Sequence, residues 1–377
     1  MKFFACQSCG TTVYFDSTVC VNCGSRLGYL PEGFQISALE LDGGRWKALA
    51  APDRFFTLCA NSEHDACNWL LPADGGAPLC LACRHNRTVP DLSSPQNVVN
   101  WRKIELAKRW LFYSLMRWRL PIPNRTQDPQ NGLAFDFLAD TTKPNGSVEP
   151  VMTGHDTGLI TINIAEADDA EREKMRVNMQ EPYRTVLGHM RHEVGHYYWD
   201  RLVRDGGKLD RFRQLFGDES QGYGEALKRH YDEGPPADWQ NAYISAYATA
   251  HPWEDFAETW AHHIHMVDGL ETVRAVGINV RPAIKNPEPL TAEVEFQPYA
   301  AASAQDLVDV WVPLTVAINS VNRSMGQPDL YPFVLSQPVI DKLQFVHEII
   351  HDRPDDDEPS SARSDGNGIY RLRAPDG

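Results

Sequence analysis

The spacing of apolar residues predicts a mostly helical chain with a small sheet. In several segments apolar side chains recur every three or four residues, the spacing that places them on one face of a helix. These segments are 98–119, 183–203, 252–267, 303–323 and 336–351. Residues 158–165 instead alternate between apolar and polar side chains, as a half-buried strand does. The expected fold class is therefore α+β.

Turn-forming residues separate these elements. Segment 204–240 is rich in Gly, Pro and Asp and is expected to be rich in loops, and segment 281–298 is rich in Pro and is expected to interrupt the helices. Residues 89–95 have the composition of a linker. The stretch from Asp352 to Gly377 is acidic and then rich in Ser and Gly, which predicts a disordered tail over 352–377.

Composition and charge exclude several classes of protein. Of 377 residues, 42% are hydrophobic, which is enough for a substantial core and too many for a disordered chain. The net charge of −15 argues against a general affinity for nucleic acids or anionic membranes. No stretch of about 18 apolar residues is present, so no transmembrane helix is expected. The N-terminus MKFFACQSCG lacks the apolar core of a signal peptide, which favours a cytoplasmic protein.

All 8 cysteines lie in the N-terminal region and form two groups. In a reducing cytoplasm, repeated Cys-x-x-Cys pairs indicate zinc sites rather than disulfides. The first group comprises Cys6, Cys9, Cys20 and Cys23. A glycine follows each of its pairs, as in the knuckles of a zinc ribbon, where a tight turn lets backbone N–H groups approach the sulfurs. Residues 1–30 are therefore predicted to form a zinc ribbon around one structural zinc ion.

The second group comprises Cys59, Cys67, Cys80 and Cys83. Only its last pair has the Cys-x-x-Cys spacing, and His64 lies between the first two cysteines as a competing ligand. A site with four cysteine ligands and a second structural zinc ion is nevertheless expected. Residues 31–97 are accordingly assigned to a second zinc-binding module and its linker.

The predicted helix 183–203 carries the sequence HEVGH. His192 and His196 are four residues apart and share a helix face, so their imidazoles can occupy adjacent corners of a zinc tetrahedron. Glu193 can reach a water molecule at such a metal without binding the metal itself. Gly195 costs a helix about 1 kcal/mol relative to alanine, and its small size suggests that another element packs closely there.

The third ligand is expected from the helix 252–267. Glu254 and Glu258 are four residues apart, so they share a helix face and can point at one site. One would bind zinc, and the other would accept the free ring N–H of a zinc-bound histidine. Spacing alone does not assign the two roles. Asp255 lies off that face and is expected to be a solvated or capping acid.

A second sequence of the same type, HEIIH, occurs at residues 347–351 and is interpreted as a chance match. The residues that follow it contain no partner helix for a third ligand. His347 and His351 are therefore expected to pair with surface carboxylates.

The HEVGH sequence and the downstream segment EDFAE at 254–258 resemble the gluzincin branch of zinc metallopeptidases, and EDFAE looks especially like the matching helix of anthrax lethal factor-like peptidases. The resemblance implies that Glu254 is the third zinc ligand and that Glu258 orients a histidine. It also implies a tyrosine shortly before this helix that donates to the oxyanion. Tyr247 matches that placement best, and Tyr243 is the alternative.

Nearly the full length of the chain resembles bacterial zinc-binding metallopeptidases with an N-terminal zinc ribbon. The ribbon, the HEVGH helix, the segment HPWEDFAETWAHH and the segment NRSMGQPDLYPF carry this resemblance. It implies a zincin-like metallopeptidase domain over residues 98–351. The expected cofactors are one catalytic and two structural zinc ions.

The expected function is zinc-dependent hydrolysis of a peptide or protein substrate. Glu193 would take a proton from the attacking water and later protonate the leaving amine. The strand around Ile160–Ile164 is the expected sheet edge for an extended peptide. Two alternatives stay open: an SprT-like protease that acts on DNA-bound proteins, and a non-catalytic adaptor whose ribbon binds a protein partner. The negative charge and the Glu-x-x-Ala-Glu helix argue against the first alternative, and Glu193 argues against the second.

Overall fold

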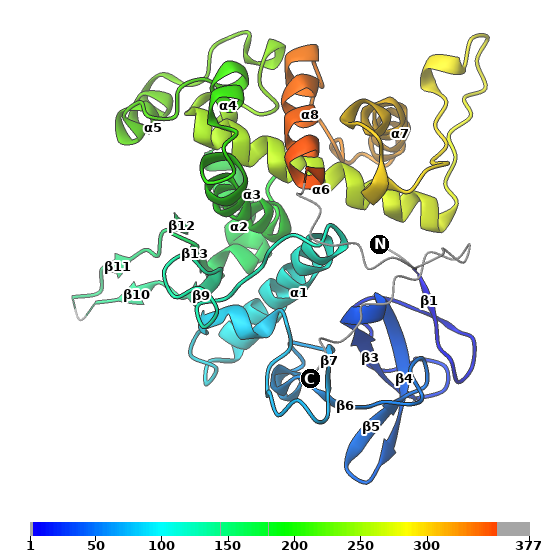
Figure 1. Ribbon diagram of the computed structural model, residues 1–377. Coiled ribbons are helices and arrows are strands. Elements are labelled where there is room, and N and C mark those ends of the chain that lie inside the picture. The colour runs from blue at the N-terminus through cyan, green and yellow to red at the C-terminus, as the bar shows by residue number, and fades with distance from the viewer. Residues whose placement is uncertain (1–2, 144, 180, 353–377) are drawn as a thin grey trace.

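The chain has a sheet-rich N-terminal part and a mainly helical remainder (Figure 1). The computed structural model describes residues 3–143, 145–179 and 181–352. The predicted disordered tail lies outside the described residues beyond Asp352. Helix α1 (Pro95–Arg117) runs between the two parts. No helix in the described ranges is long and apolar enough to cross a membrane.

Two small sheets form the N-terminal part. Strands β1 (Phe4–Ala5) and β2 (Thr12–Val13) pair antiparallel. The other sheet is an antiparallel meander with the strand order β3-β4-β5-β6-β7. Its strands are β3 (Arg26–Leu30), β4 (Gln35–Asp42), β5 (Arg45–Ala48), β6 (Phe55–Leu58) and β7 (Leu70–Pro72). The sequence did not predict this meander, because most of its strands are too short to show a clear alternation.

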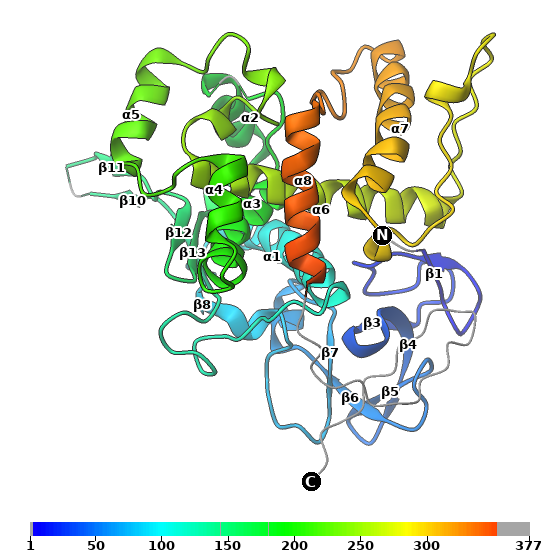
Figure 2. The same cartoon turned by 45° about the horizontal axis from the view of Figure 1, so that its top comes forward.

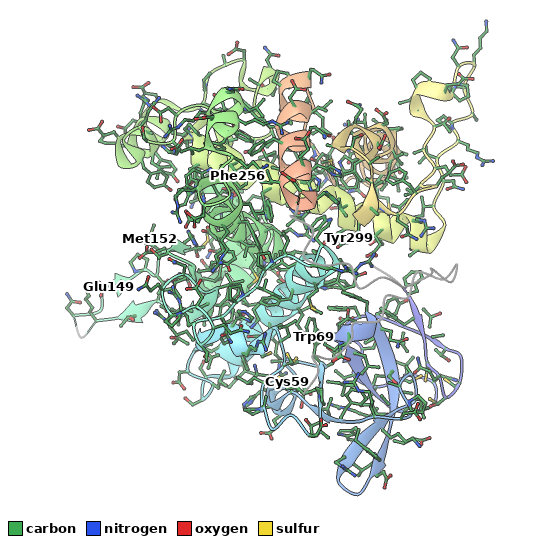
Figure 3. The ribbon with its side chains drawn as sticks, viewed as in Figure 1. Cys59, Trp69, Glu149, Met152, Phe256 and Tyr299 are labelled. Atoms are coloured by element: carbon green, nitrogen blue, oxygen red, sulfur yellow. The ribbon has the colours of Figure 1, made fainter. Side chains whose placement is uncertain are left out.

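Buried aromatic rings join the N-terminal part to α1. The ring of Phe15 lies 4.7 Å from that of Tyr29 and 4.1 Å from that of Trp110, which belongs to α1. Trp69 is fully buried beside Tyr29, with the ring centroids 5.0 Å apart, and lies between the meander and α1 (Figure 3). Because these rings bury a large apolar area, the ribbon is packed against the helical part and does not hang from a free linker.

A third sheet belongs mainly to the C-terminal part and has the strand order β12-β13-β9-β8. Its strands are β8 (Asn86–Thr88), β9 (Ala134–Leu138), β12 (Gly154–Asp156) and β13 (Leu159–Asn163), and β10 (Thr141–Thr142) with β11 (Val148–Glu149) forms a separate hairpin. The strand predicted at 158–165 is β13. It is not at the edge, because β9 pairs with it in parallel on one side and β12 antiparallel on the other. The edge strand beside β13 is β12, so the prediction that residues 160–164 form the edge is wrong.

One of the remaining helices carries the HEVGH sequence. This sequence lies on α3 (Val186–Tyr198), which continues as a π-helical segment over Trp199–Arg204. The others are α2 (Asp169–Asn178), α4 (Leu209–Phe216), α5 (Tyr223–Glu233), α6 (Pro252–Val276), α7 (Ala304–Ser324) and α8 (Gln337–His351). Helices α4 and α5 lie in the segment predicted to be a loop, and α6 extends well beyond residue 267.

Phenylalanine packing explains why α4 forms. In Figures 1 and 2, α8 stands beside α4 and α6. The ring of Phe216 on α4 lies 5.8 Å from those of Phe256 on α6 and Phe345 on α8. A helix of eight residues gains little from propensity, so this tertiary packing supplies its stability.

Candidate metal centres

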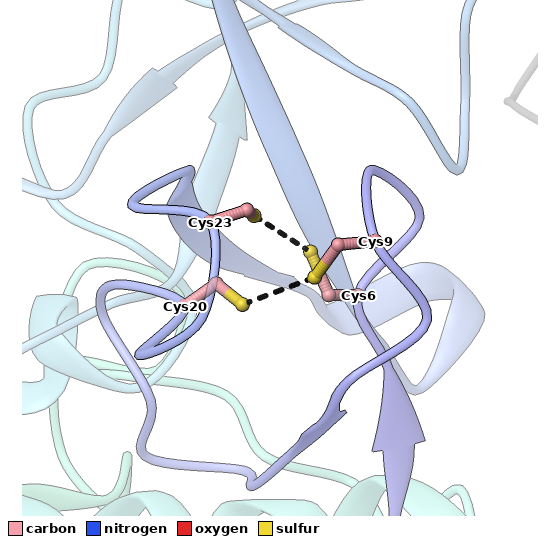
Figure 4. A group of neighbouring side chains, drawn as sticks. All are labelled: Cys6, Cys9, Cys20 and Cys23. Atoms are coloured by element: carbon pink, nitrogen blue, oxygen red, sulfur yellow. Dashed lines mark hydrogen bonds between the residues drawn. The ribbon is translucent and has the colours of Figure 1, made fainter.

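The four cysteines of the first group converge, as predicted. The Sγ atoms of Cys6 and Cys23 lie 3.7 Å apart, and those of Cys9 and Cys20 lie 3.6 Å apart (Figure 4). A tetrahedral zinc ion with Zn–S distances of about 2.3 Å separates its sulfurs by about 3.8 Å. All four thiols lie within 4.8 Å of one another, so they fit zinc.

The second cysteine group also converges and is buried throughout. Cys59, Cys67, Cys80 and Cys83 have their Sγ atoms within 4.8 Å of one another. His64 is exposed and its ring lies edge-on to that of Trp101, with the centroids 5.8 Å apart, so it does not compete for this group.

Two buried charges of α1 lie against this second group. The Sγ atom of Cys83 lies 3.6 Å from Glu105 Oε2, and Lys108 Nζ donates to the Glu105 carboxylate at 2.9 Å. Both α1 side chains have no exposed surface. Burial raises the pKa of Glu105 to about 7, although Lys108 acts in the opposite direction. The cysteine group is therefore coupled electrostatically to the helical part of the chain.

His192, His196 and Glu254 form a third buried cluster, with all three ligand atoms within 4.8 Å. Oε2 of Glu254 lies 2.9 Å from His192 Nε2 and 3.5 Å from His196 Nε2. A tetrahedral zinc ion bound by two imidazole nitrogens and one carboxylate oxygen requires N–O separations of about 3.4 Å. Two imidazoles and one carboxylate, on α3 and α6, therefore fit the ion that the sequence predicted.

Glu258 holds His192 from the opposite side. Oε1 of Glu258 lies 2.7 Å from His192 Nδ1, and the hydroxyl of Ser245 donates to Glu258 Oε2 at 2.6 Å. Burial would raise the pKa of Glu258, but the hydrogen bond with His192 brings it down to about 2. An ionised Glu258 fixes the tautomer of His192 and directs Nε2 toward Glu254. Ser245 was not identified from the sequence.

A close approach of α3 and α6 at Gly195 brings these ligands together. A Cβ atom at Gly195 would lie 3.0 Å from the Cα atom of Ala257 and 3.3 Å from its carbonyl oxygen. The close packing expected from the size of this glycine is therefore present. Since the contact is to backbone atoms of Ala257, no side-chain rotation can relieve it.

Gly195→Ala is expected to destabilise the protein by about 1–3 kcal/mol, because the added methyl group pushes the two helices apart. Gly224→Ala on α5 is the matched control, since no atom lies within 4 Å of the added Cβ. This control should gain up to about 1 kcal/mol from helix propensity. Chemical unfolding of both variants, with zinc content measured in parallel, checks the prediction. Equal stability changes in the two variants would contradict the close-approach argument.

The structure places Glu193 and Tyr247 beside this cluster but not Tyr243. Glu193 is buried on α3 between the two histidines in sequence. The ring of Tyr247 lies 5.8 Å from that of His192. Burial raises the pKa of Tyr247 well above its usual value, and Glu254 adds to the shift. Tyr243 instead faces Lys342, whose Nζ lies 4.3 Å from the ring centroid.

Three further side chains border the cluster and were missed in the sequence. The hydroxyl of Tyr223 donates to Glu254 Oε1 at 2.6 Å. The ring of Trp253 lies 3.9 Å from that of His196, and His155 on the edge strand β12 stacks on His196 at 6.1 Å. Tyr223 lies in the segment predicted to be a loop, so no helical spacing pointed to it.

The HEIIH sequence does not form a metal cluster among the described residues. His347 is buried on α8, with Nδ1 3.3 Å from His263 Nε2. The ring nitrogens of His351 face the backbone carbonyls of His347 and Tyr299 at 2.7 and 3.3 Å. Their predicted pairing with surface carboxylates is wrong, because α8 packs these histidines against α6 and the segment before α7.

The prediction that Asp255 is solvated is also wrong. Asp255 is fully buried, and Lys342 Nζ donates to it at 2.6 Å. Burial raises the pKa of Asp255 to about 7, although Lys342 lowers it. Helix α8 packs on α6 and covers Asp255, a tertiary contact that helical spacing does not reveal.

A cysteine-rich, sheet-containing N-terminal part and a helical part with a buried two-histidine, one-carboxylate cluster define a zinc-binding class of protein. The chain belongs to the family described as "Putative zinc-binding metallo-peptidase", whose family model matches residues 97–349. Residues 3–94 match the model of a zinc-ribbon domain.

Relatives in mycobacteria share this organisation over their whole length. Uncharacterized proteins of Mycobacterium tuberculosis and Mycobacterium bovis are 40% identical over 364 residues, covering 96% of this chain and 99% of each relative. No solved structure gives a comparable match.

Proposed function

We propose that this protein is a zinc-dependent peptidase with a gluzincin-type centre in a zincin-like domain. The observation that carries the proposal is the single oxygen of Glu254 that faces Nε2 of both His192 and His196. His192, His196 and Glu254 would hold the catalytic ion, and the two cysteine groups would hold structural ions. When bound, the zinc ion supplies a Lewis acid that polarises a carbonyl and lowers the pKa of water toward about 7.

The residues of this chain account for the remaining chemistry. Glu193 takes a proton from the attacking water at its carboxylate and delivers it to the leaving amine. The hydroxyl of Tyr247 donates a hydrogen bond to the carbonyl oxygen as negative charge develops there. Glu258 keeps His192 in the tautomer that presents Nε2 to the centre.

The edge strand β12 is where an extended substrate would pair. It hydrogen-bonds to β13 on one side only within its sheet, and it packs against α3. His155 on β12 stacks on His196, so a peptide added to this edge would run past the cluster. A peptide or protein substrate and a cytoplasmic location are part of the same proposal.

Metal counting and a peptide library test this function together. The full-length protein is expected to hold about three zinc ions per chain and to cleave peptides of the library. His196→Ala should hold about two and cleave none. Two ions in the wild-type protein would favour the adaptor alternative. Three ions with cleavage only in the presence of DNA would favour the SprT-like alternative.

A further inference from the structure

The two oxygens of the Glu254 carboxylate have different partners. Oε2 faces the two histidine Nε2 atoms at 2.9 and 3.5 Å. Oε1 accepts a hydrogen bond from the hydroxyl of Tyr223 at 2.6 Å. Glu254 is only 1% exposed, so solvent cannot take the place of that donor. Tyr223 thus determines which oxygen of the carboxylate is presented to the histidines.

Tyr223 reaches Glu254 from a helix that is otherwise loosely attached. It is the first residue of α5, and Ala226 is the one buried residue of that helix. The ring of Tyr223 packs on His251 at 5.2 Å and on Trp253 at 5.8 Å, next to the cluster. Elements with few buried apolar groups open at low free-energy cost. The hydroxyl of Tyr223 is therefore a main point at which α5 is tied to the cluster.

We propose that Tyr223 is a positioning residue that holds Glu254 as a one-oxygen ligand, and that it couples docking of α5 to occupation of the metal site. This inference rests on the proposed function, because it requires zinc at His192, His196 and Glu254.

The one-oxygen geometry has a chemical consequence. A carboxylate with both oxygens free can bind a metal through both and fill an additional coordination position. With Oε1 occupied by Tyr223, only Oε2 binds, and one position stays open for water or substrate, as catalytic zinc requires. Linkage then works in both directions: if a docked α5 strengthens metal binding, metal binding stabilises the docked α5 by the same factor.

Tyr223→Phe tests the positioning role while it retains the aromatic ring. The variant's affinity for the zinc ion at His192, His196 and Glu254, here called the third zinc ion, is expected to fall by about 10- to 100-fold. This is the usual effect of losing a hydrogen-bond partner of a metal ligand. Native mass spectrometry of the full chain, with a chelator of known affinity, counts the ions that remain. Tyr231→Phe is the matched control, because Tyr231 lies on the same helix, is 63% exposed and has its hydroxyl at Tyr247, which is not a metal ligand, rather than at Glu254.

Hydrogen exchange provides a readout that does not depend on activity. In the wild-type protein, loading the third zinc ion should slow exchange of the α5 amides. In Tyr223→Phe at saturating zinc, this protection should be reduced. In Tyr231→Phe it should persist. A thermal melt of each metal-depleted variant shows whether the substitutions alter the fold itself.

The outcomes separate the two proposals. If the wild-type protein never holds a third ion, the proposed function fails and the role of Tyr223 fails with it. If the third ion binds equally tightly to the wild type and to Tyr223→Phe, with unchanged protection of α5, the role of Tyr223 is wrong and the proposed function stands. Weakened binding in Tyr223→Phe without any change in Tyr231→Phe supports both.

Discussion

Replacing Glu193 with glutamine is expected to lower kcat for peptide hydrolysis by about 10²- to 10⁴-fold, the range that a positioned general base contributes. Glutamine has nearly the same shape as glutamate, but its amide cannot accept a proton from water. The variant should therefore fold normally and keep its metal. Peptide cleavage and zinc content, measured on the same preparation, check both parts.

The metal should stay bound because Glu193 is not one of its ligands. The cluster consists of His192, His196 and Glu254. Glu193 is 6% exposed and follows His192 on α3. Burial raises the pKa of the Tyr223 and Tyr247 hydroxyls, and the nearby Glu193 carboxylate adds to both shifts. Glu193 therefore lies beside the metal cluster but is not one of its ligands.

The second HExxH sequence provides the control for this experiment. Glu348 occupies the same place in HEIIH as Glu193 in HEVGH, but its carboxylate pairs with Arg211 at the surface. Glu348→Gln should leave peptide hydrolysis unchanged. If Glu193→Gln retained wild-type activity, or if Glu348→Gln abolished it, the assignment of the general base to α3 would be wrong.

Helical spacing predicted the two pairs of side chains that meet at this cluster, whereas the choice of Glu254 rather than Glu258 as the ligand came from the resemblance to known peptidases. Residues four apart on one helix must share a face, so His192 with His196, and Glu254 with Glu258, each form a pair before any tertiary structure is known. The convergence of the two pairs depends on the glycine at position 195, whose size is also visible in the sequence. The cysteine groups were predictable for a similar reason, since their spacing fits zinc knuckles.

Features that depend on tertiary contacts were not predicted. The partners Tyr223 and Glu254 lie on different helices, and nothing in their local sequences links them. Lys342 pairs with Asp255 only because α8 packs on α6. The edge position of β12 follows from pairing between strands that are distant in sequence. The spacing of residues along a helix predicts which side chains share a face. Which element packs on that face depends on tertiary contacts, which the spacing does not contain.

Loss of the second cysteine group is expected to affect the whole chain. Binding of a structural zinc ion contributes about 10–16 kcal/mol in small zinc domains, comparable to or larger than the total stability of about 5–15 kcal/mol typical of a protein. Cys83→Ser removes a thiolate whose sulfur lies 3.6 Å from Glu105 on α1. Lys108, fully buried beside it, would lose a negative partner that offsets its charge.

This effect should reach the cluster of His192, His196 and Glu254 through α1, which packs against both the second cysteine group and α3. Cys83→Ser is therefore expected to lower the thermal stability of the helical part and to weaken binding of the third zinc ion. Circular dichroism melts report the first change, and metal counting reports the second.

Cys9→Ser in the first group is the matched comparison. Cys9 is exposed, and its sulfur contacts Cys20 and Thr11 within the ribbon rather than any residue of α1. Loss of this ligand should unfold the knuckles around β1 and β2 while the third zinc ion stays bound. Equal losses of stability and of the third ion in both variants would show that the two cysteine groups act alike. A larger loss in Cys83→Ser would show that the buried group supports α3 through α1, whereas the first group mainly stabilises the knuckles around it.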